Sequence, residues 1–280
     1  MKIGFIGLGK MGYGIAYNIS KKYNVSIWNR TNNIAKKHSI EHNTIFTKNI
    51  FDIFKKNNVI FTCLPTSYEV IEIIKNNSNY LQKDTILIDC TTGDPYITKE
   101  IGSILKTHNS YILDCPVSGG PGKAHTGTLT SMIGGEKYIY NKVEDIIKSF
   151  SNPIYCGCLG NANAIKSINN ILNITHLCIA SEGLNALKNY GVDPNIALKV
   201  INKSSGRSLM TEERIPQEII TEKYNYGFKI GLMNKDIQIA NKLLGDTIMF
   251  KETYKLLNKF LINNDDNLDY TEITKLLYKN

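Results

Sequence analysis

The first twelve residues constrain the fold of this chain more than any other segment. Lys2 to Ile6 form a short apolar run, and Gly7-Leu8-Gly9-Lys10-Met11-Gly12 follows it directly. In a strand–turn–helix unit, the first glycine of such a turn permits tight bending, and the second lets the backbone approach a pyrophosphate. The third lets the helix pack against the strand. The free N–H groups and the dipole at the helix start also favour phosphate. The motif therefore predicts a dinucleotide-binding turn that uses Gly7, Leu8, Gly9, Met11 and Gly12.

Strand-like runs alternate with helical segments through the first half of the chain. They cover residues 2–6, 24–29, 58–63, 85–90 and 111–115. The third and fourth runs are almost continuously apolar, as expected for parallel strands that are buried on both faces. The alternation predicts an α/β fold with a Rossmann-type, doubly wound parallel sheet. Its ligand is expected beyond the carboxyl ends of the strands.

The second half of the chain lacks strand patterns. Residues 163–189 have the apolar spacing of one long helix, and further helices are expected at 235–245 and 248–262. Asp94-Pro95 and Asp193-Pro194 are typical of an N-cap followed by the first helical residue. We therefore expect a dinucleotide-binding domain over residues 1–161 and an all-helical domain for substrate binding and oligomerisation over residues 162–280.

Composition excludes several classes of protein. The net charge of +8 comes from 33 basic and 25 acidic residues, but the lysines are dispersed in pairs, which indicates a solvated surface and no nucleic-acid partner. No run of 18 apolar residues occurs, so no membrane span is expected. The six cysteines lie mostly in apolar segments, which suggests free thiols in a reducing compartment, the cytoplasm. Cys156-Gly157-Cys158 has the wrong spacing for zinc, and we expect no metal site.

Several ordered motifs extend over nearly the whole chain. They are GFIGLGKMG at 4–12, LPTS at 64–67, LIDCTTGDP at 87–95, DCPVSGGPGKAHTGTLT at 114–130, GCLGNANAIKSINN at 157–170, SSGR at 204–207 and GFKIGLMNKD at 227–236. With these motifs the chain resembles the β-hydroxyacid dehydrogenases, and most closely the 3-hydroxyisobutyrate dehydrogenases among them. The resemblance implies an oxidoreductase that transfers a hydride between a nicotinamide cofactor and a short 3-hydroxy acid or semialdehyde.

Lys166 and Asn170 are the candidate reacting and orienting residues. Their spacing of four places both side chains on one face of the long predicted helix, about one turn apart. A lysine ammonium can protonate the alkoxide that forms as hydride arrives, and the neutral amine can remove the hydroxyl proton in reverse. The resemblance assigns these roles to the matching residues, so Lys166 is expected to act as general acid and base and Asn170 to bind the substrate.

Further site residues follow from the chain's small residues and from the resemblance. Ser118-Gly119-Gly120 can direct N–H groups and a hydroxyl at an anion, and in the family the matching residues clamp the substrate carboxylate. The resemblance places Leu64, Pro65 and Thr92 at the nicotinamide. It also implies that Lys235 reaches the cofactor or substrate, and the next residue, Asp236, could hold that lysine or cap its helix.

The end of the second strand bears on the choice of cofactor. NAD-specific units usually carry an acid there for the ribose 2′-hydroxyl, whereas this chain has Asn29-Arg30-Thr31. An arginine fork suits a 2′-phosphate. We therefore expect NADP, with NAD possible, bound through Arg30 with help from Asn29 and Thr31. This departs from the typical 3-hydroxyisobutyrate dehydrogenase pattern and is similar to NADPH-dependent glyoxylate and succinic semialdehyde reductases.

Three alternatives stay open at this point. The chain could be a reductase of glyoxylate or succinic semialdehyde, or a catalytically silent, cofactor-binding interaction protein, although Lys166 argues against the latter. The third alternative is a 6-phosphogluconate dehydrogenase. Those related enzymes are longer and have His-Asn where this chain has Asn169-Asn170, which argues against it. The long apolar helices of the second half, together with the family resemblance, imply a homodimer or homotetramer.

Overall fold

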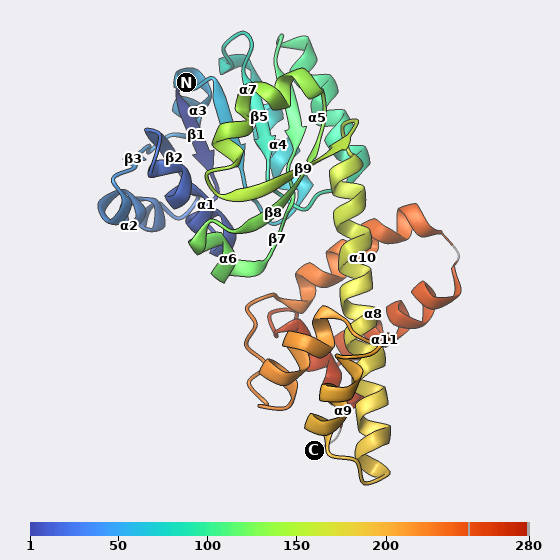
Figure 1. Cartoon of the computed structure of the whole chain (residues 1–280). Helices are drawn as coiled ribbons and strands as arrows, with labels where there is room; N and C mark the ends of the chain where they lie inside the picture. Colours follow the sequence, from blue (N-terminus) through green and yellow to red (C-terminus); the bar gives the residue numbers. More distant parts are fainter. Residues whose placement is uncertain (246, 279–280) are drawn as a thin grey trace. The chain divides into compact units, whose positions relative to one another are not determined.

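The computed structural model describes residues 1–245 and 247–278. The chain forms two compact units, Met1–Lys166 and Ser167–Asn280. The boundary between them lies inside one helix, α8 (Asn161–Asn189), which Figure 1 shows as an uninterrupted rod. The boundary expected from the sequence, at residues 161/162, lies in the first turn of the same helix.

The first unit contains a doubly wound sheet, as predicted. In the part of the chain that the structure describes, nine strands pair in the order β3-β2-β1-β4-β5-β6-β8-β7, and β9 pairs with β8. The strands are β1 (Ile3–Ile6), β2 (Val25–Trp28), β3 (Ile45–Phe46), β4 (Val59–Thr62), β5 (Ile86–Asp89), β6 (Tyr111–Asp114), β7 (Val117–Ser118), β8 (Leu129–Gly134) and β9 (Ser151–Gly157). The first six are parallel, which confirms the five predicted strands to within a residue or two at each end.

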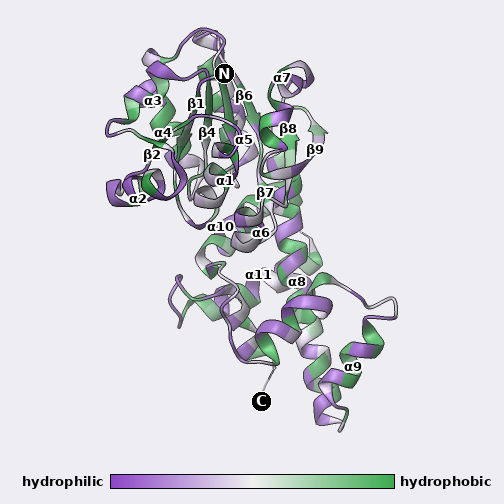
Figure 2. Ribbon diagram, turned by 60° about the vertical axis from the view of Figure 1, so that its left-hand side comes forward, coloured by the Kyte–Doolittle hydropathy of each residue, from purple (hydrophilic) through white to green (hydrophobic). Residues whose placement is uncertain are grey.

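Helices cover both faces of this sheet, and alternate strand residues face opposite ways. Phe5 and Phe61 belong to a core formed with α1 and α7, whereas Ile6 and Ile60 belong to a second core formed with α3, α4 and α5. Figure 2 shows the central strands coloured as hydrophobic between these helices. The helices of this unit are α1 (Lys10–Ser20), α2 (Asn32–His42), α3 (Ile50–Lys56), α4 (Ser67–Asn77), α5 (Pro95–Thr107), α6 (Gly120–Thr126) and α7 (Lys137–Ile147), with a 3-10 turn at Ser78–Tyr80.

The sequence did not predict the strands β3, β7, β8 and β9. β8 pairs antiparallel with β6 and β7 but parallel with β9, so the sheet continues past its doubly wound part. β3 and β7 have only two residues each, which is too short for a detectable periodicity. β9 is largely exposed and contains Pro153, which hides its strand character.

The second unit is helical, which confirms the predicted architecture. It contains most of α8, then α9 (Pro194–Ile201), a π-helical segment (Met210–Ile219), α10 (Ile230–Leu244), α11 (Ile248–Leu261) and a 3-10 helix (Tyr270–Leu276). Tyr270 is fully buried in the core of this unit, and its hydroxyl accepts a hydrogen bond from Arg214 Nε at 3.2 Å. None of the described helices is both long and apolar enough to cross a membrane.

Two helix starts predicted from Asp-Pro pairs are confirmed. Asp94 accepts the N–H of Tyr96 at 2.9 Å, and Asp193 accepts the N–H of Asn195 at 2.7 Å. In both helices the proline occupies the first turn, where its missing N–H costs no hydrogen bond. These boundaries could be predicted because the capping interaction is local in sequence.

Candidate active site

The glycine-rich turn after β1 requires two of its glycines for packing. Gly7 has φ +98°, and a Cβ there would lie 2.4 Å from the carbonyl oxygen of Cys63. A Cβ on Gly12 would lie 2.0 Å from the Gly7 carbonyl oxygen. Both positions therefore exclude any side chain, because α1 and β4 approach the turn too closely.

Gly9 differs, because nothing in the described chain requires it to be glycine. Its φ of −71° and ψ of −172° suit any residue, and a Cβ would meet no other atom within 4 Å. Gly9 is the N-cap of α1, where no side chain caps the helix and no acidic residue lies in the first turn. Open space and uncapped N–H groups at a helix start suit the pyrophosphate of a dinucleotide, so the turn fits the cofactor.

Asn29 fastens the end of β2 to this turn. Its side-chain oxygen accepts the N–H of Leu8 at 2.9 Å, and its amide donates to the carbonyl of Thr31 at 3.1 Å. The Leu8 side chain is only 2% exposed and packs in the core, so it contributes to the turn by packing. Arg30 and Thr31 are exposed beside the turn.

Asp89 holds together the ends of β4 and β5. One oxygen of its fully buried carboxyl group accepts the Thr62 hydroxyl at 2.8 Å and the N–H of Thr91 at 3.0 Å. Thr91 in turn accepts the N–H of Leu64 at 3.0 Å. Burial raises the pKa of Asp89 to about 6. This role could not be predicted from the sequence, because Thr62 lies on a different strand, 27 residues from Asp89.

The positions of the predicted cofactor residues follow from the sheet order. Gly7, Asn29, Leu64 and Thr92 come directly or shortly after β1, β2, β4 and β5, which are neighbours in the sheet. Because parallel strands end at one edge, these residues gather there. Leu64 and Thr92 are half-buried and Pro65 is exposed.

The Ser118-Gly119-Gly120 turn connects β7 to α6. Its glycines have φ +133° and +74°, and a Cβ on Gly119 would lie 2.8 Å from the Lys123 side chain. Ser118 pairs in register with Thr130 of β8. Positive φ at two successive positions strains any residue that has a side chain, so this turn depends on glycine at both.

Asp114, at the end of β6, caps the start of α8. Its two carboxyl oxygens accept the N–H groups of Gly160 and Asn163, each at 2.9 Å. Asp114 is fully buried, and burial raises its pKa. Lys166, one turn further along α8, is buried with 8% of its surface exposed. The cap therefore fixes the helix that carries the candidate catalytic lysine.

In the second unit, Asp236 connects two of the predicted site residues. Its Oδ2 accepts the amide of Asn170 at 2.6 Å, and its Oδ1 pairs with Lys235 Nζ at 3.0 Å. Asn170 and Asp236 are almost completely buried, while the Lys235 side chain is one-fifth exposed. Of the two roles considered for Asp236, the structure shows that it holds the lysine, and it adds the contact with Asn170.

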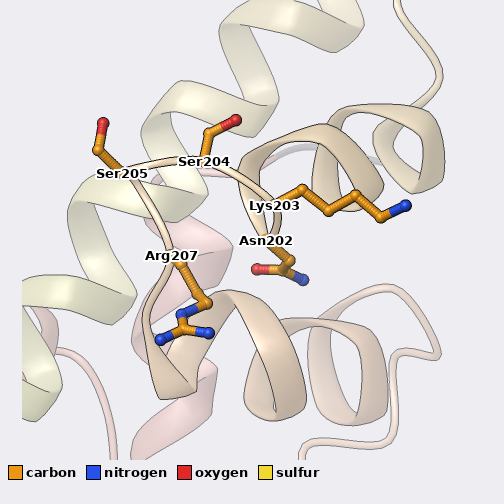
Figure 3. A pocket seen from close by; sticks show the side chains of 5 residues that line it. All are labelled: Asn202, Lys203, Ser204, Ser205 and Arg207. Atoms are coloured by element: carbon orange, nitrogen blue, oxygen red, sulfur yellow. The ribbon is translucent and has the colours of Figure 1, made fainter.

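The SSGR motif lies beside a polar pocket of about 520 Å³ in the second unit. Asn202, Lys203, Ser204, Ser205 and Arg207 line it. Figure 3 shows that the serine hydroxyls point to one side and the Arg207 and Asn202 side chains to the other. Ser204 donates to the carbonyl of Val200, and Arg207 pairs with Glu212 at 3.6 Å. The polar groups do not converge as those of a specific site do.

Across residues 1–245 and 247–278, no three His, Cys, Asp or Glu side chains lie close enough to hold a metal ion. All six cysteines are free thiols.

Family profiles match both units. A profile for the NAD binding domain of 6-phosphogluconate dehydrogenase matches residues 2–160, and one described as NAD-binding of NADP-dependent 3-hydroxyisobutyrate dehydrogenase matches residues 160–277.

Individual proteins are similar over most of their length. The chain is 30% identical to a probable mitochondrial 3-hydroxyisobutyrate dehydrogenase of Dictyostelium discoideum, covering 99% of this chain and 91% of that protein. It is 32% identical to the human mitochondrial 3-hydroxyisobutyrate dehydrogenase over 85% of this chain and 74% of that protein. Among solved structures, Mycobacterium tuberculosis 3-hydroxyisobutyrate dehydrogenase with L-serine superposes with a TM-score of 0.91 at 22% identity, covering 99% of each chain.

Proposed function

Because this chain belongs to the β-hydroxyacid dehydrogenases and is an NAD(P)-binding oxidoreductase of the 3-hydroxyisobutyrate dehydrogenase type, we propose that it transfers a hydride between NADP(H) and a short 3-hydroxy acid or its semialdehyde. The observation that carries this proposal is the buried Lys166 on α8, followed one turn later by Asn170, which Asp236 holds in place.

Lys166 acts as the general acid and base in this proposal. During reduction its ammonium group donates a proton to the forming alkoxide, and during oxidation its neutral amine removes the hydroxyl proton. Asn170 orients the substrate oxygen, because the hydrogen bond to Asp236 fixes its amide. Ser118, Gly119 and Gly120 bind the substrate carboxylate through the turn between β7 and α6. When bound, the cofactor supplies or accepts the hydride.

The proposed cofactor-binding residues are those of the glycine turn together with Asn29, Leu64, Pro65, Thr92 and Lys235. Arg30 gives the preference for NADP(H), because it is exposed at the end of β2 where an acid would repel a 2′-phosphate. A solved neighbour, Psf3 in complex with NADP+ and 2-OPP, supports this choice, with a TM-score of 0.88 at 21% identity.

Arg30→Ala should raise the NADPH dissociation constant by about tenfold or more and change NADH binding little. Equal effects on both nucleotides would contradict the assignment.

A panel of aldehydes identifies the substrate. NADPH consumption is measured with methylmalonate semialdehyde, succinic semialdehyde, tartronate semialdehyde and glyoxylate, with NADH in parallel. Turnover of methylmalonate semialdehyde supports the 3-hydroxyisobutyrate dehydrogenase reaction. Preference for glyoxylate or succinic semialdehyde supports the reductase alternative, which the Asn29-Arg30-Thr31 segment favours. NADPH binding without turnover of any aldehyde would leave the silent interaction protein.

The exposed face of α8 supports a homodimer or homotetramer. Leu172 and Ile179 are 50% and 57% exposed, and Ala186 is also exposed. Their spacing of seven places them along one face, where a partner helix can pack. Light scattering coupled to size exclusion should show a dimer or tetramer that dissociates in Leu172→Glu; a monomeric wild type would contradict this.

The proposed location is the cytoplasm. All six thiols are free, as a reducing compartment would keep them. The curated relatives are named as mitochondrial, so fractionation with antibodies against the chain is the test. Enrichment with mitochondria would overturn the proposed location.

A further inference from the structure

Asn163 lies in the first turn of α8, and both the oxygen and the nitrogen of its side-chain amide form hydrogen bonds. Its Oδ1 accepts the N–H of Gly93 at 2.9 Å, and its Nδ2 donates to the Thr98 hydroxyl at 3.1 Å. Its own backbone N–H donates to Asp114. The residue is completely buried. A buried amide with both groups paired resists reorientation, because each alternative leaves a polar group without a partner.

The partner of Asn163 belongs to the loop that follows β5. Gly93 is buried, and a Cβ on it would lie 3.2 Å from Ser67 and 3.4 Å from the Asn163 amide, so the loop is tightly enclosed. Asp94 N–H donates to the Ser67 hydroxyl at 3.1 Å. Thr91, at the other end, is held through Asp89 and Leu64. Thr92, which is half-buried, therefore lies between residues that are held in place by hydrogen bonds.

We propose that Asn163 is a positioning residue, which sets the distance between the loop that carries Thr92 and the helix that carries Lys166. Asn163 and Lys166 are three residues apart, so they project from the same side of α8. The hydrogen bond to Gly93 therefore joins the first turn of the catalytic helix to the loop assigned to the nicotinamide. This inference rests on the proposed function, which gives Lys166 and Thr92 their roles.

A purely structural role for this amide as a helix cap does not account for its contacts. Asp114 already caps α8 by accepting the N–H groups of Gly160 and Asn163. The Asn163 side chain makes no capping contact with its own helix among the bonds that the structure shows. It reaches to Gly93 and to Thr98 of α5, which belong to the segment after β5.

The test compares Asn163→Ala with Asn161→Ala in the full-length protein. Asn161 is the matched control, because it lies in the same turn, is exposed, and its side-chain amide donates to the carbonyl of Cys156, outside the loop after β5. Asn163→Ala should lower kcat by about tenfold or more, because small displacements of reacting groups are costly, with the NADPH dissociation constant within about threefold of wild type. Asn161→Ala should leave both unchanged.

A kinetic isotope effect separates positioning from stability. With NADPH deuterated at the transferred position, the effect on kcat should rise in Asn163→Ala, since a misplaced donor makes hydride transfer more rate-limiting. Thr98→Val provides a milder variant in case Asn163→Ala folds poorly. It removes the acceptor of the Asn163 amide and should lower kcat in the same direction by about threefold.

An unchanged kcat and isotope effect in both Asn163→Ala and Thr98→Val, with only a lower melting temperature, would overturn the positioning role. The kcat and isotope effect of each variant are compared with those of an active wild type. If the wild type turns over no aldehyde, the proposed function itself fails, whereas an active wild type with unaffected variants refutes Asn163 alone.

Discussion

Gly9→Ala should separate cofactor binding from folding. The backbone angles at Gly9 are open to alanine, and the added methyl would meet no other described atom within 4 Å. The substitution restricts the unfolded chain, which stabilises the protein by about 0.4–1 kcal/mol. Alanine is a poorer N-cap than glycine, which costs about 0.5–1 kcal/mol. These contributions offset each other, so the free energy of unfolding should change by less than about 0.5 kcal/mol.

Cofactor affinity should change much more. The methyl group projects into the open space at the start of α1 in which the pyrophosphate is proposed to bind. We expect the NADPH dissociation constant to rise by at least about tenfold, which corresponds to about 1.4 kcal/mol. Gly12→Ala is the contrasting variant, because its Cβ would lie 2.0 Å from the Gly7 carbonyl oxygen. Gly12→Ala should weaken NADPH binding and should also lower the free energy of unfolding by about 1–3 kcal/mol.

The fluorescence of Trp28 can report both the free energy of unfolding and the affinity for NADPH. It is the single tryptophan of the chain, it ends β2, and its carbonyl accepts the N–H of Gly7 at 3.0 Å. Its fluorescence reports urea unfolding of the apoprotein and energy transfer to bound NADPH. Wild-type NADPH affinity in Gly9→Ala would refute the reasoning, and so would a stability loss as large as that of Gly12→Ala.

Three further predictions concern buried polar groups. Asp236→Ala leaves the Asn170 amide without its acceptor, so kcat should fall by about tenfold; an unchanged kcat would remove Asn170 from the site. Burial lowers the pKa of His38 to about 4, below its value in the unfolded chain, so stability present above about pH 6.5 is lost as the pH falls toward 4, by up to about 3 kcal/mol. Urea unfolding across this range checks it, and His38→Gln should remove the dependence. Burial raises the pKa of Asp89 to about 6, so the native state keeps a proton that the unfolded chain releases between about pH 4 and 6. Stability should therefore fall by up to about 3 kcal/mol as the pH rises through that window, and the same titration on Asp89→Asn should lack this fall.

The sequence was sufficient wherever the determining interaction is local. The glycine turn, the apolar parallel strands and the Asp94 and Asp193 caps each depend on residues within a few positions of one another. The architecture followed from these elements, because alternating strands and helices allow few topologies. The motifs shared with the family then indicated which residues to consider for the site.

The contacts that hold the site could not be predicted from local pattern. Asn163 and Gly93 are 70 residues apart, and Asp114 and Gly160 are 46 apart. Asn29 was expected to assist the choice of cofactor, and its side chain is occupied by Leu8 and Thr31. Such pairings depend on strand order and loop path, which single residue types do not reveal. The resemblance supplied the list of candidates, and only the structure shows how they are held.

The central claim is that Lys166 exchanges the proton during hydride transfer. The most direct test measures NADPH consumption by Lys166→Ala and by wild type with the preferred aldehyde, together with the NADPH affinity of each. The account predicts that the variant binds NADPH within about threefold of wild type but loses turnover by at least about a hundredfold. Turnover near the wild-type rate in Lys166→Ala would contradict the account.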